Sequence, residues 1–311
     1  MIVVFGSLNA DFVFPVAALP REGETVACEA VLLMPGGKGA NQAVAAARAG
    51  AEVRMAGCVG GDSFGDLLVG SLEEAGVGLG ALERVAAPTG CAAVVVDAEG
   101  RNQIVVAGGA NLEAKASQIE DGDLGPATTV LVQCEVRPGE NRELARRARA
   151  AGARVLFNAA PAGSLDPDML RSVDCLLVNE IEASVVAKAA GLDASGPIEE
   201  ARALAGAFAM GCVVTMGGGG AYASLPGGQR PGGEWQVDAL PVEPVDTTGA
   251  GDAFVGVFAA SLDAGLDVAE ALHRASVAGS LACLTEGAQP SLPSAADIDQ
   301  RLAGLAPVRR L

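Results

Sequence analysis

The sequence has few of the residues on which several common chemistries depend. Its 311 residues include one histidine, one tryptophan and one tyrosine. A site that needs a histidine base or several histidine ligands would rest on His273 alone, and within "AEALHRASVAG" a partly buried structural histidine is the better interpretation. The seven cysteines are scattered singly and never form a C-x-x-C pair, which indicates reduced, mostly buried thiols of a cytoplasmic protein and no zinc site.

A concentrated cluster of basic residues and a long apolar run are also missing. The formal net charge is −17, and the most basic stretch, "RELARRARA", has the spacing of a solvated helix face. Nucleic-acid binding relies on concentrated basic charge, so we expect no nucleic-acid partner. No apolar run approaches the roughly 20 residues that span a bilayer, so we expect no membrane association. The opening "MIVVFGSLNADFVF" lacks the basic start and cleavage site of a secretory signal and predicts a buried first strand.

The residues that are present alternate between strand-like and helix-like runs. Apolar stretches such as "IVVFG", "VRMAGCVG", "TVLVQCE", "RVLFN", "DCLLVN" and "CVVTM" are separated by amphipathic segments. Continuous apolar strands between helices indicate a parallel sheet that is covered on both faces. The sequence therefore predicts one α/β domain over 1–311. The expected helices lie at about 40–49, 62–76, 140–152, 180–191, 252–264, 267–284 and 295–304.

Two segments interrupt this alternation with strands and turns. They are "ADFVFPVAALPREGETVACEAVLL" and "TGCAAVVVDAEGRNQIVVAGG", the second a predicted hairpin that turns at "DAEG". Together they would form a small sheet that projects over the main one. A third segment, "LPGGQRPGGEWQ", predicts a flexible surface loop.

The common phosphate-binding fingerprints do not fit. In "MPGGKGANQ", Gly39 stands where a P-loop needs Ser or Thr. In "GAGDAF", Phe254 stands where the dinucleotide fingerprint needs glycine, which disfavours NAD binding and a dehydrogenase.

Four other motifs each allow a structural and a functional interpretation. "GGKGANQ" is either a tight turn with a helix cap or a surface that binds hydroxyl groups, and Asn9 and Asp11 of "GSLNAD" would extend such a surface at the end of the first strand. "MGGGGA" is either a bare turn or a place where the backbone approaches a nucleotide. In "DTTGAGDAF", Asp252 is either a helix cap or a catalytic carboxylate beside an anion hole.

Together and in this order, the motifs resemble the ribokinase/PfkB family of carbohydrate kinases. The resemblance runs from "FGSLNAD" through "PGGKGANQAVAAARAG", "VGGDSFGD", "NAAPA", "LLVNEIEA" and "VDTTGAGDAFVG" to "EGAQPSLP", and covers essentially the whole chain. "GGKGAN" and "DTTGAGDAF" are highly specific to the family. The resemblance implies a ribokinase-like three-layer sandwich with a mostly parallel central sheet and a small β-sheet lid within about 11–34 and 88–109.

The resemblance also implies which residues carry the reaction. Asp252 would take the proton of the attacking sugar hydroxyl, and the backbone N–H groups of Gly249, Ala250 and Gly251 would form the anion hole. The sugar would be held by Asn9, Ala10, Asp11, Gly37, Lys38, Gly39, Ala40, Asn41, Glu135 and Asp252.

Nucleotide and metal positions follow from the same resemblance. The nucleotide would lie along Asn179, Thr215, Met216, Gly217, Gly218, Gly219, Gly220, Gly251, Asp252 and Ser276. Glu182 would help to arrange the Mg²⁺ that accompanies ATP, through water. A monovalent cation, usually K⁺, would lie among Asp246, Thr248, Ala282, Thr285, Gly287 and Ser291.

The implied activity is ATP-dependent phosphorylation of the 5-hydroxyl of D-ribose, and "EGAQPS" favours the ribose kinases within the family. Related kinases accept 2-deoxyribose, fructose or nucleosides on the same scaffold, and a non-catalytic sugar sensor is a rival of another class. The lid would exclude water from the reaction. By analogy, the lids of two subunits would clasp each other in a homodimer.

Overall fold

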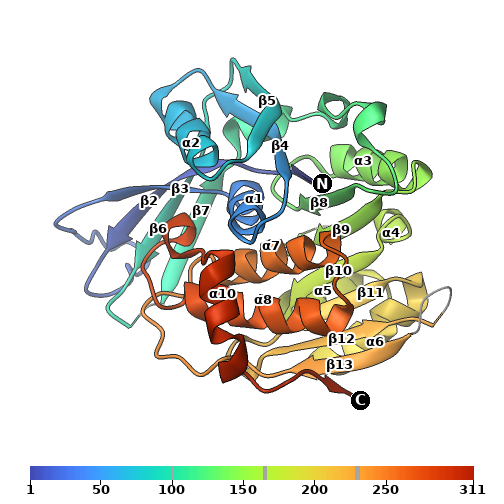
Figure 1. The fold of residues 1–311 in the computed structure, drawn as a ribbon. Helices are drawn as coiled ribbons and strands as arrows, with labels where there is room; N and C mark the ends of the chain where they lie inside the picture. The colour runs from blue at the N-terminus through green and yellow to red at the C-terminus, as the bar shows by residue number, and fades with distance from the viewer. Residues whose placement is uncertain (100, 164–166, 228–231) are drawn as a thin grey trace.

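A ten-stranded sheet forms the middle layer of the protein (Figure 1). The computed structural model describes residues 1–99, 101–163, 167–227 and 232–311. The strand order is β14-β13-β12-β11-β10-β9-β8-β1-β4-β5. In this spatial order, each neighbouring pair from β11 through β5 is parallel, whereas the pairs β11–β12, β12–β13 and β13–β14 are antiparallel. The bounds are β1 Ile2–Phe5, β4 Val53–Gly60, β5 Gly78–Val85, β8 Thr129–Gln133, β9 Arg154–Asn158, β10 Cys175–Asn179, β11 Gly211–Thr215, β12 Ala221–Leu225, β13 Gly233–Val237 and β14 Arg309–Arg310.

The sheet separates two hydrophobic cores, which explains why successive residues in the middle of its central strands are apolar. In β1, Ile2 and Val4 face one core, whereas Val3 and Phe5 face the other. Side chains alternate along a strand, so a strand covered on both faces buries all of them. Helices α1 Lys38–Arg48, α2 Ser63–Glu74, α7 Ala250–Asp263, α8 Val268–Ala282 and α10 Ala295–Arg301 cover the first face, and α3 Pro138–Ala150, α4 Pro167–Leu170, α5 Glu180–Ala189 and α6 Pro197–Phe208 cover the second.

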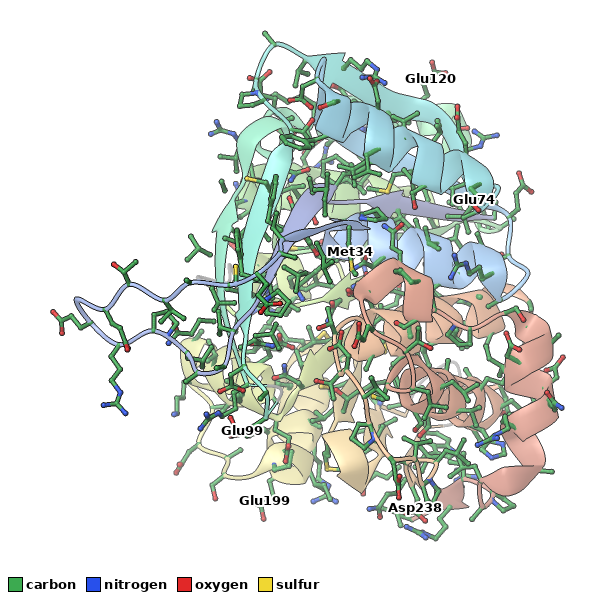
Figure 2. All side chains as sticks on the ribbon, turned by 90° about the vertical axis from the view of Figure 1, so that its left-hand side faces the viewer. Met34, Glu74, Glu99, Glu120, Glu199 and Asp238 are labelled. Atoms are coloured by element: carbon green, nitrogen blue, oxygen red, sulfur yellow. The ribbon has the colours of Figure 1, made fainter. Side chains whose placement is uncertain are left out.

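A separate four-stranded sheet projects from one side of this body (Figures 1 and 2). It is built from β2 Asn9–Pro15, β3 Leu32–Gly36, β6 Gly90–Val96 and β7 Asn102–Ala107 in the order β3-β2-β6-β7. Strands β6 and β7 pair antiparallel, so the predicted hairpin is confirmed, while Gly100 of its "DAEG" turn lies outside the described residues. Strand β2 leaves the end of β1 after three residues, so the small sheet begins at the edge where the parallel strands end.

Two predictions about the fold need correction. Residues 228–231 of "LPGGQRPGGEWQ" lie outside the described residues, but its last four residues belong to β13 and are not a loop. Strand β13 pairs with β12 at Trp235↔Ala223, a partnership that the segment itself does not reveal. Helix α6 was not predicted; its buried residues are Glu200, Ala201, Leu204 and Ala205, so a charged side chain interrupts its apolar face.

Two smaller predictions concern the histidine and the cysteines. His273 is partly buried, as predicted, and its Nε2 lies 3.1 Å from the carbonyl oxygen of Leu305. All seven cysteines are free, but the prediction that most are buried is wrong: only Cys58, Cys175 and Cys212 are buried, and Cys28 is exposed. None of the helices in the described part of the chain is both long and apolar enough to span a membrane.

Candidate active site

The ends of several parallel strands meet the beginnings of helices α1, α5 and α7 around a small polar cavity of ≈ 220 Å³. Residues at or just after the ends of β9, β10 and β11 reach it, as do residues from the first turns of the three helices. It brings together predicted site residues from distant segments of the chain. Its lining includes Lys38, Asn179, Glu182, Thr215, Gly249, Gly251 and Asp252, together with Asn158 and Thr247, which the sequence did not single out as site residues.

Asp252 lies in the first turn of α7 with 9% of its surface exposed. Its Oδ2 accepts a hydrogen bond from Asn41 Nδ2 at 2.9 Å, and its Oδ1 accepts one from Gln42 Nε2 at 2.9 Å. Helices α1 and α7 cross closely at Gly256, where an added Cβ would lie 2.6 Å from the Cβ of Ala45. This close crossing sets the carboxylate beside two amide donors and fixes both of its oxygens.

A second carboxylate, Glu135, follows β8 and gathers donors from the other side of the site. Its Oε2 accepts from Ser7 Oγ at 2.5 Å, from the Lys38 backbone N–H at 3.3 Å and from Asn9 Nδ2 at 3.4 Å. Asn111 Nδ2 in turn donates to Asn9 Oδ1 at 2.8 Å. The structure therefore brings the predicted sugar residues Asn9, Lys38 and Glu135 together.

Sequence reasoning missed Ser7 and Asn111, which orient the groups around Glu135. Ser7 lies inside the "GSLNAD" motif but beside the residues selected from it. Asn111 lies in a short 3₁₀ helix more than 100 residues from Asn9, and its side chain, which is 1% exposed, also bonds the backbone of Leu8. No local signal in the sequence marks Asn111; only the buried pairing of its amide reveals the role.

The site has an excess of acidic charge around Lys38. Burial, followed by the charges of Glu135 and Asp252, raises the pKa of Asp11 to about 7, and Lys38 opposes this only in part. Burial alone would lower the pKa of Lys38, but the carboxylates of Asp252, Glu135 and Glu182 outweigh it, so the pKa of Lys38 is raised. The ammonium group therefore stays charged and is available to an anion.

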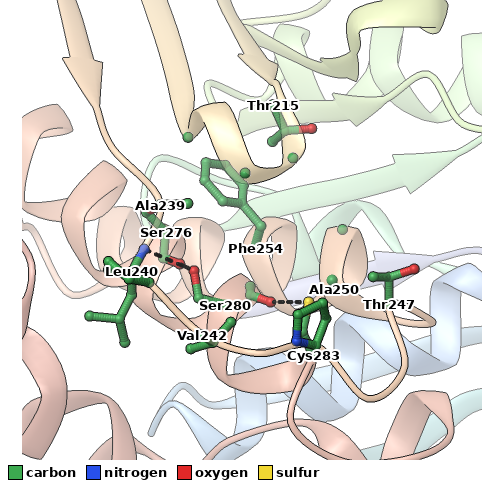
Figure 3. A pocket seen from close by; sticks show the side chains of 17 residues that line it. Thr215, Ala239, Leu240, Val242, Thr247, Ala250, Phe254, Ser276, Ser280 and Cys283 are labelled. Atoms are coloured by element: carbon green, nitrogen blue, oxygen red, sulfur yellow. Dashed lines mark hydrogen bonds between the residues drawn. The ribbon is translucent and has the colours of Figure 1, made fainter.

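A groove of ≈ 530 Å³ adjoins the small polar cavity and shares Thr215, Thr247 and Gly251 with it. Thr215 lies on one side of this groove, and Leu240 and Val242 lie on the other (Figure 3). Of the predicted nucleotide residues, Thr215, Gly217, Gly218, Gly220, Gly251 and Ser276 line it. Asn179 and Asp252 line the small cavity instead, and Met216 and Gly219 line neither.

The sequence analysis did not predict the residues on the apolar side of this groove. Leu240, Val242 and Phe254 supply it, from the segment after β13 and from α7. Alternating apolar residues in "DALPVEP" were a readable but unspecific signal. The hydroxyl of Ser276 donates to the backbone carbonyl of Asp238 at 2.7 Å, so it already has a partner in the wall of the groove.

The residues predicted to hold a monovalent cation come from two turns that lie side by side. The Asp246 carboxylate joins the turns, since Oδ1 accepts from the Thr248 N–H at 2.9 Å and Oδ2 from the Gly287 N–H at 2.8 Å. The hydroxyl of Ser291 donates to the carbonyl of Ala288 at 2.7 Å. Ala282 is the last residue of α8, and Thr285 lies between it and the second turn. This set of carboxylate, hydroxyl and carbonyl oxygens suits a hard cation.

Glu182 and Asn179 form a reciprocal cap at the start of α5. The Glu182 N–H donates to Asn179 Oδ1 at 2.8 Å, and the Asn179 N–H donates to Glu182 Oε2 at 2.9 Å. Burial raises the pKa of Glu182. Within the described ranges no group of three or more His, Cys, Asp or Glu side chains is placed to hold a metal. A Mg²⁺ ion that arrives on a nucleotide needs only one or two protein carboxylates, so Glu182 fits that role.

Comparison with known proteins agrees with this geometry. Residues 1–295 match the pfkB family of carbohydrate kinases. The ribokinase of Bacillus subtilis is 36% identical over 309 residues, which cover 97% of this chain and 99% of that protein. A solved ribokinase from Thermotoga maritima has a TM-score of 0.87 at 31% identity, with 97% of this chain and 99% of that one covered. The Arabidopsis thaliana ribokinase, solved with ribose and ATP, has a TM-score of 0.84 at 31% identity, with 97% and 98% covered. The resemblance seen in the motifs is confirmed: the chain belongs to the pfkB family of carbohydrate kinases.

Proposed function

We propose that the protein is an ATP-dependent kinase that transfers a phosphoryl group to the 5-hydroxyl of D-ribose and releases D-ribose 5-phosphate and ADP. One observation carries the proposal: the buried Asp252 lies in a cavity that opens into the glycine-lined groove and also receives Lys38 of the sugar-side cluster. A sugar hydroxyl and a terminal phosphate could meet there. Ribokinases among the relatives, one of them solved with ribose and ATP, support ribose as the sugar.

In this proposal Asp252 accepts the proton of the attacking hydroxyl. Asn9, Asp11, Lys38, Asn41 and Glu135 bind and orient the sugar, with the backbone at Ala10 and from Gly37 to Ala40 beside them. The anion hole lies at the start of α7, where the helix dipole also favours negative charge. The Ala250 N–H donates to the Thr247 carbonyl at 3.2 Å, so we assign the hole mainly to the N–H groups of Gly249 and Gly251.

Two ions complete the proposal. Mg²⁺ would be held by the phosphates of ATP with Glu182 behind a water molecule, and it would neutralise charge on the phosphates. A monovalent cation, K⁺ by analogy, would be held by oxygens of Asp246, Thr248, Ala282, Thr285, Gly287 and Ser291. Because Asp246 already ties the turn before α7 to the turn before α9 Ala288–Ser291, a cation there would help to order the anion hole.

We further propose that the small sheet is a lid over the sugar. A cavity of ≈ 410 Å³ lies between it and the two cation-site turns, lined by Asp11, Leu32 and Met34 on one side and by Asp246 and Gly287 on the other. Figure 2 labels Met34, near the inner end of this sheet, and Glu99, between β6 and β7. Closure of the sheet would exclude water and limit wasteful hydrolysis of ATP.

The lid also carries exposed apolar side chains that support a homodimer. Ile104, Val105 and Val106 of β7 are 52%, 73% and 46% exposed, and Leu33 of β3 is 45% exposed. Apolar side chains gathered on one sheet favour contact with a second protein surface, and we propose the lid of a second copy. A cytoplasmic location is also proposed, supported by the seven free cysteines.

The proposed function is tested by measuring ADP release with Mg-ATP and D-ribose, 2-deoxyribose, fructose or adenosine, each with and without K⁺. We expect the fastest turnover with ribose, and a rate that increases with K⁺. Faster turnover with another compound would replace ribose but keep the kinase. If no compound supports turnover while a separate titration still detects sugar binding, a sugar sensor becomes the better assignment.

The raised pKa of the Asp11 carboxyl predicts that sugar affinity depends on pH. Its pKa of about 7 in the sugar-free protein means that the carboxyl is mostly protonated at pH 6 and mostly ionised at pH 8. The ionised group accepts from two neighbouring hydroxyls with both oxygens, whereas the protonated group turns one oxygen into a donor and binds the pair less well. We therefore expect the dissociation constant of ribose to fall about tenfold from pH 6 to pH 8. Calorimetric titration without ATP measures this. Asp11→Asn should bind more weakly and lose the dependence; a wild-type affinity that is constant over this range would contradict the assignment.

A further inference from the structure

A buried chain of amide side chains lies behind the Asp252 carboxylate. Gln42, which is fully buried in α1, donates from Nε2 to Asp252 Oδ1 and to Asn158 Oδ1, each at 2.9 Å. Its Oε1 accepts from Gln133 Nε2 at 2.8 Å. Neither Gln42 nor Gln133 is exposed to the cavity in which substrate would lie, since both are 0% exposed.

The direction of these hydrogen bonds is fixed by their outer ends. Asn158 Nδ2 donates to the Leu177 carbonyl at 3.0 Å, so Asn158 must present its oxygen to Gln42. An ionised Asp252 can only accept. Two acceptors therefore face the same end of Gln42, and only its NH₂ group can satisfy both. A flipped Gln42 would set its oxygen against two other oxygens in a buried site, which is costly.

The arrangement holds Asp252 in one rotation. The Asn41 amide restrains Oδ2, and the fully buried Gln42 amide restrains Oδ1. A carboxylate that is free to turn would present its lone pairs to the substrate hydroxyl for only part of the time. Orientation of reacting groups contributes strongly to catalysis, and small displacements are costly.

We propose that Gln42 is a positioning residue for the reaction: its amide fixes the orientation of the Asp252 carboxylate without touching the substrate. This inference rests on the proposed role of Asp252 as the base. Gln42 reaches the cavity through Asp252 and Asn158, and of these two only Asp252 takes part in the proposed reaction, so we expect removal of Gln42 to affect turnover and leave sugar binding intact. Gln133 offers a matched comparison, because it is an equally buried glutamine in the same chain of amides but does not contact Asp252.

The test is a double-mutant cycle on the full-length protein, with kcat and KM for ribose measured at saturating Mg-ATP. One hydrogen bond to a charged group predicts a roughly 10–100-fold lower kcat for Gln42→Met with KM within about twofold. Gln133→Met should reduce thermal stability about as much as Gln42→Met does, because each removes a buried amide. It should change kcat less than about twofold. In an Asp252→Asn background, Gln42→Met should cost less than about twofold, because the carboxylate that it positions is gone.

Each other outcome has a definite meaning. If Gln42→Met lowers kcat by the same factor in both backgrounds, or not at all, Gln42 only fills space and the inference is wrong. If Asp252→Asn retains wild-type kcat, the error lies instead in the proposed role of Asp252. Should Gln42→Met fail to fold, Gln42→Glu preserves the size of the side chain and turns an oxygen toward Asp252 Oδ1. We expect a loss of kcat at least as large in Gln42→Glu, and normal turnover in it would also overturn the inference.

Discussion

Replacement of Asp252 by asparagine is expected to lower kcat roughly 10²–10⁴-fold, the usual contribution of a positioned general base. The change keeps the shape of the side chain and removes its ability to take a proton. Its new NH₂ group can find an acceptor, because Asn41 Oδ1 is buried without a hydrogen-bond partner among the described residues and an amide flip would turn it toward residue 252. The fold and the affinity for ribose should therefore change little.

Turnover of this variant is measured by ADP release, and ribose binding by calorimetry. Asp267→Asn is the matched control, since Asp267 also lies at the start of a helix, α8, where it accepts from the Glu270 N–H at 2.9 Å, and asparagine caps a helix equally well. We expect wild-type kcat in the control. Near-normal kcat in Asp252→Asn would refute the proposed mechanism, whereas equal loss of binding and turnover would make Asp252 a sugar ligand only.

Gly36→Ala is expected to weaken ribose binding roughly 10–100-fold, the equivalent of about one hydrogen bond to a charged group. Gly36 lies opposite Asn9 in the pairing of β3 with β2, and the Asp11 carboxylate occupies the space beside its Cα. A Cβ at this position would lie 2.0 Å from Asp11 Oδ2. The carboxylate would have to move, while the backbone of a regular strand accepts alanine without strain.

Gly80→Ala serves as the control for this substitution. Gly80 lies in β5, and an added Cβ there meets no atom within 4 Å. We expect ribose affinity of the control to match the wild type, and both variants to melt cooperatively. If Gly36→Ala binds ribose as tightly as the wild type, Asp11 does not contact the sugar in the way proposed, and the pH dependence of binding should then be absent as well.

Local sequence patterns were enough for most of the architecture. The burial of whole strands and the periodicity of helices are properties of short segments, which is why the alternation from β1 to β11 and the hairpin of the small sheet could be predicted. Strand β13 could not, because its place in the sheet depends on its pairing with β12 and not on its own residues. Helix α6 was missed because the charged Glu200 belongs to its buried face, and only its tertiary surroundings reveal that burial.

The sequence alone determined the family and predicted the principal polar residues of the candidate site, since "GGKGAN" and "DTTGAGDAF" carry glycines and polar side chains in a specific order. Only the tertiary structure decided which groups orient them. Gln42 reaches Asp252 across 210 residues, Asn111 reaches Asn9 across 102, and Leu240 and Val242 of the apolar wall of the groove come from a segment with no motif. Such buried pairings are formed by the crossing of helices and the ends of strands, and a hydrogen bond between distant residues leaves no periodic signal in the chain.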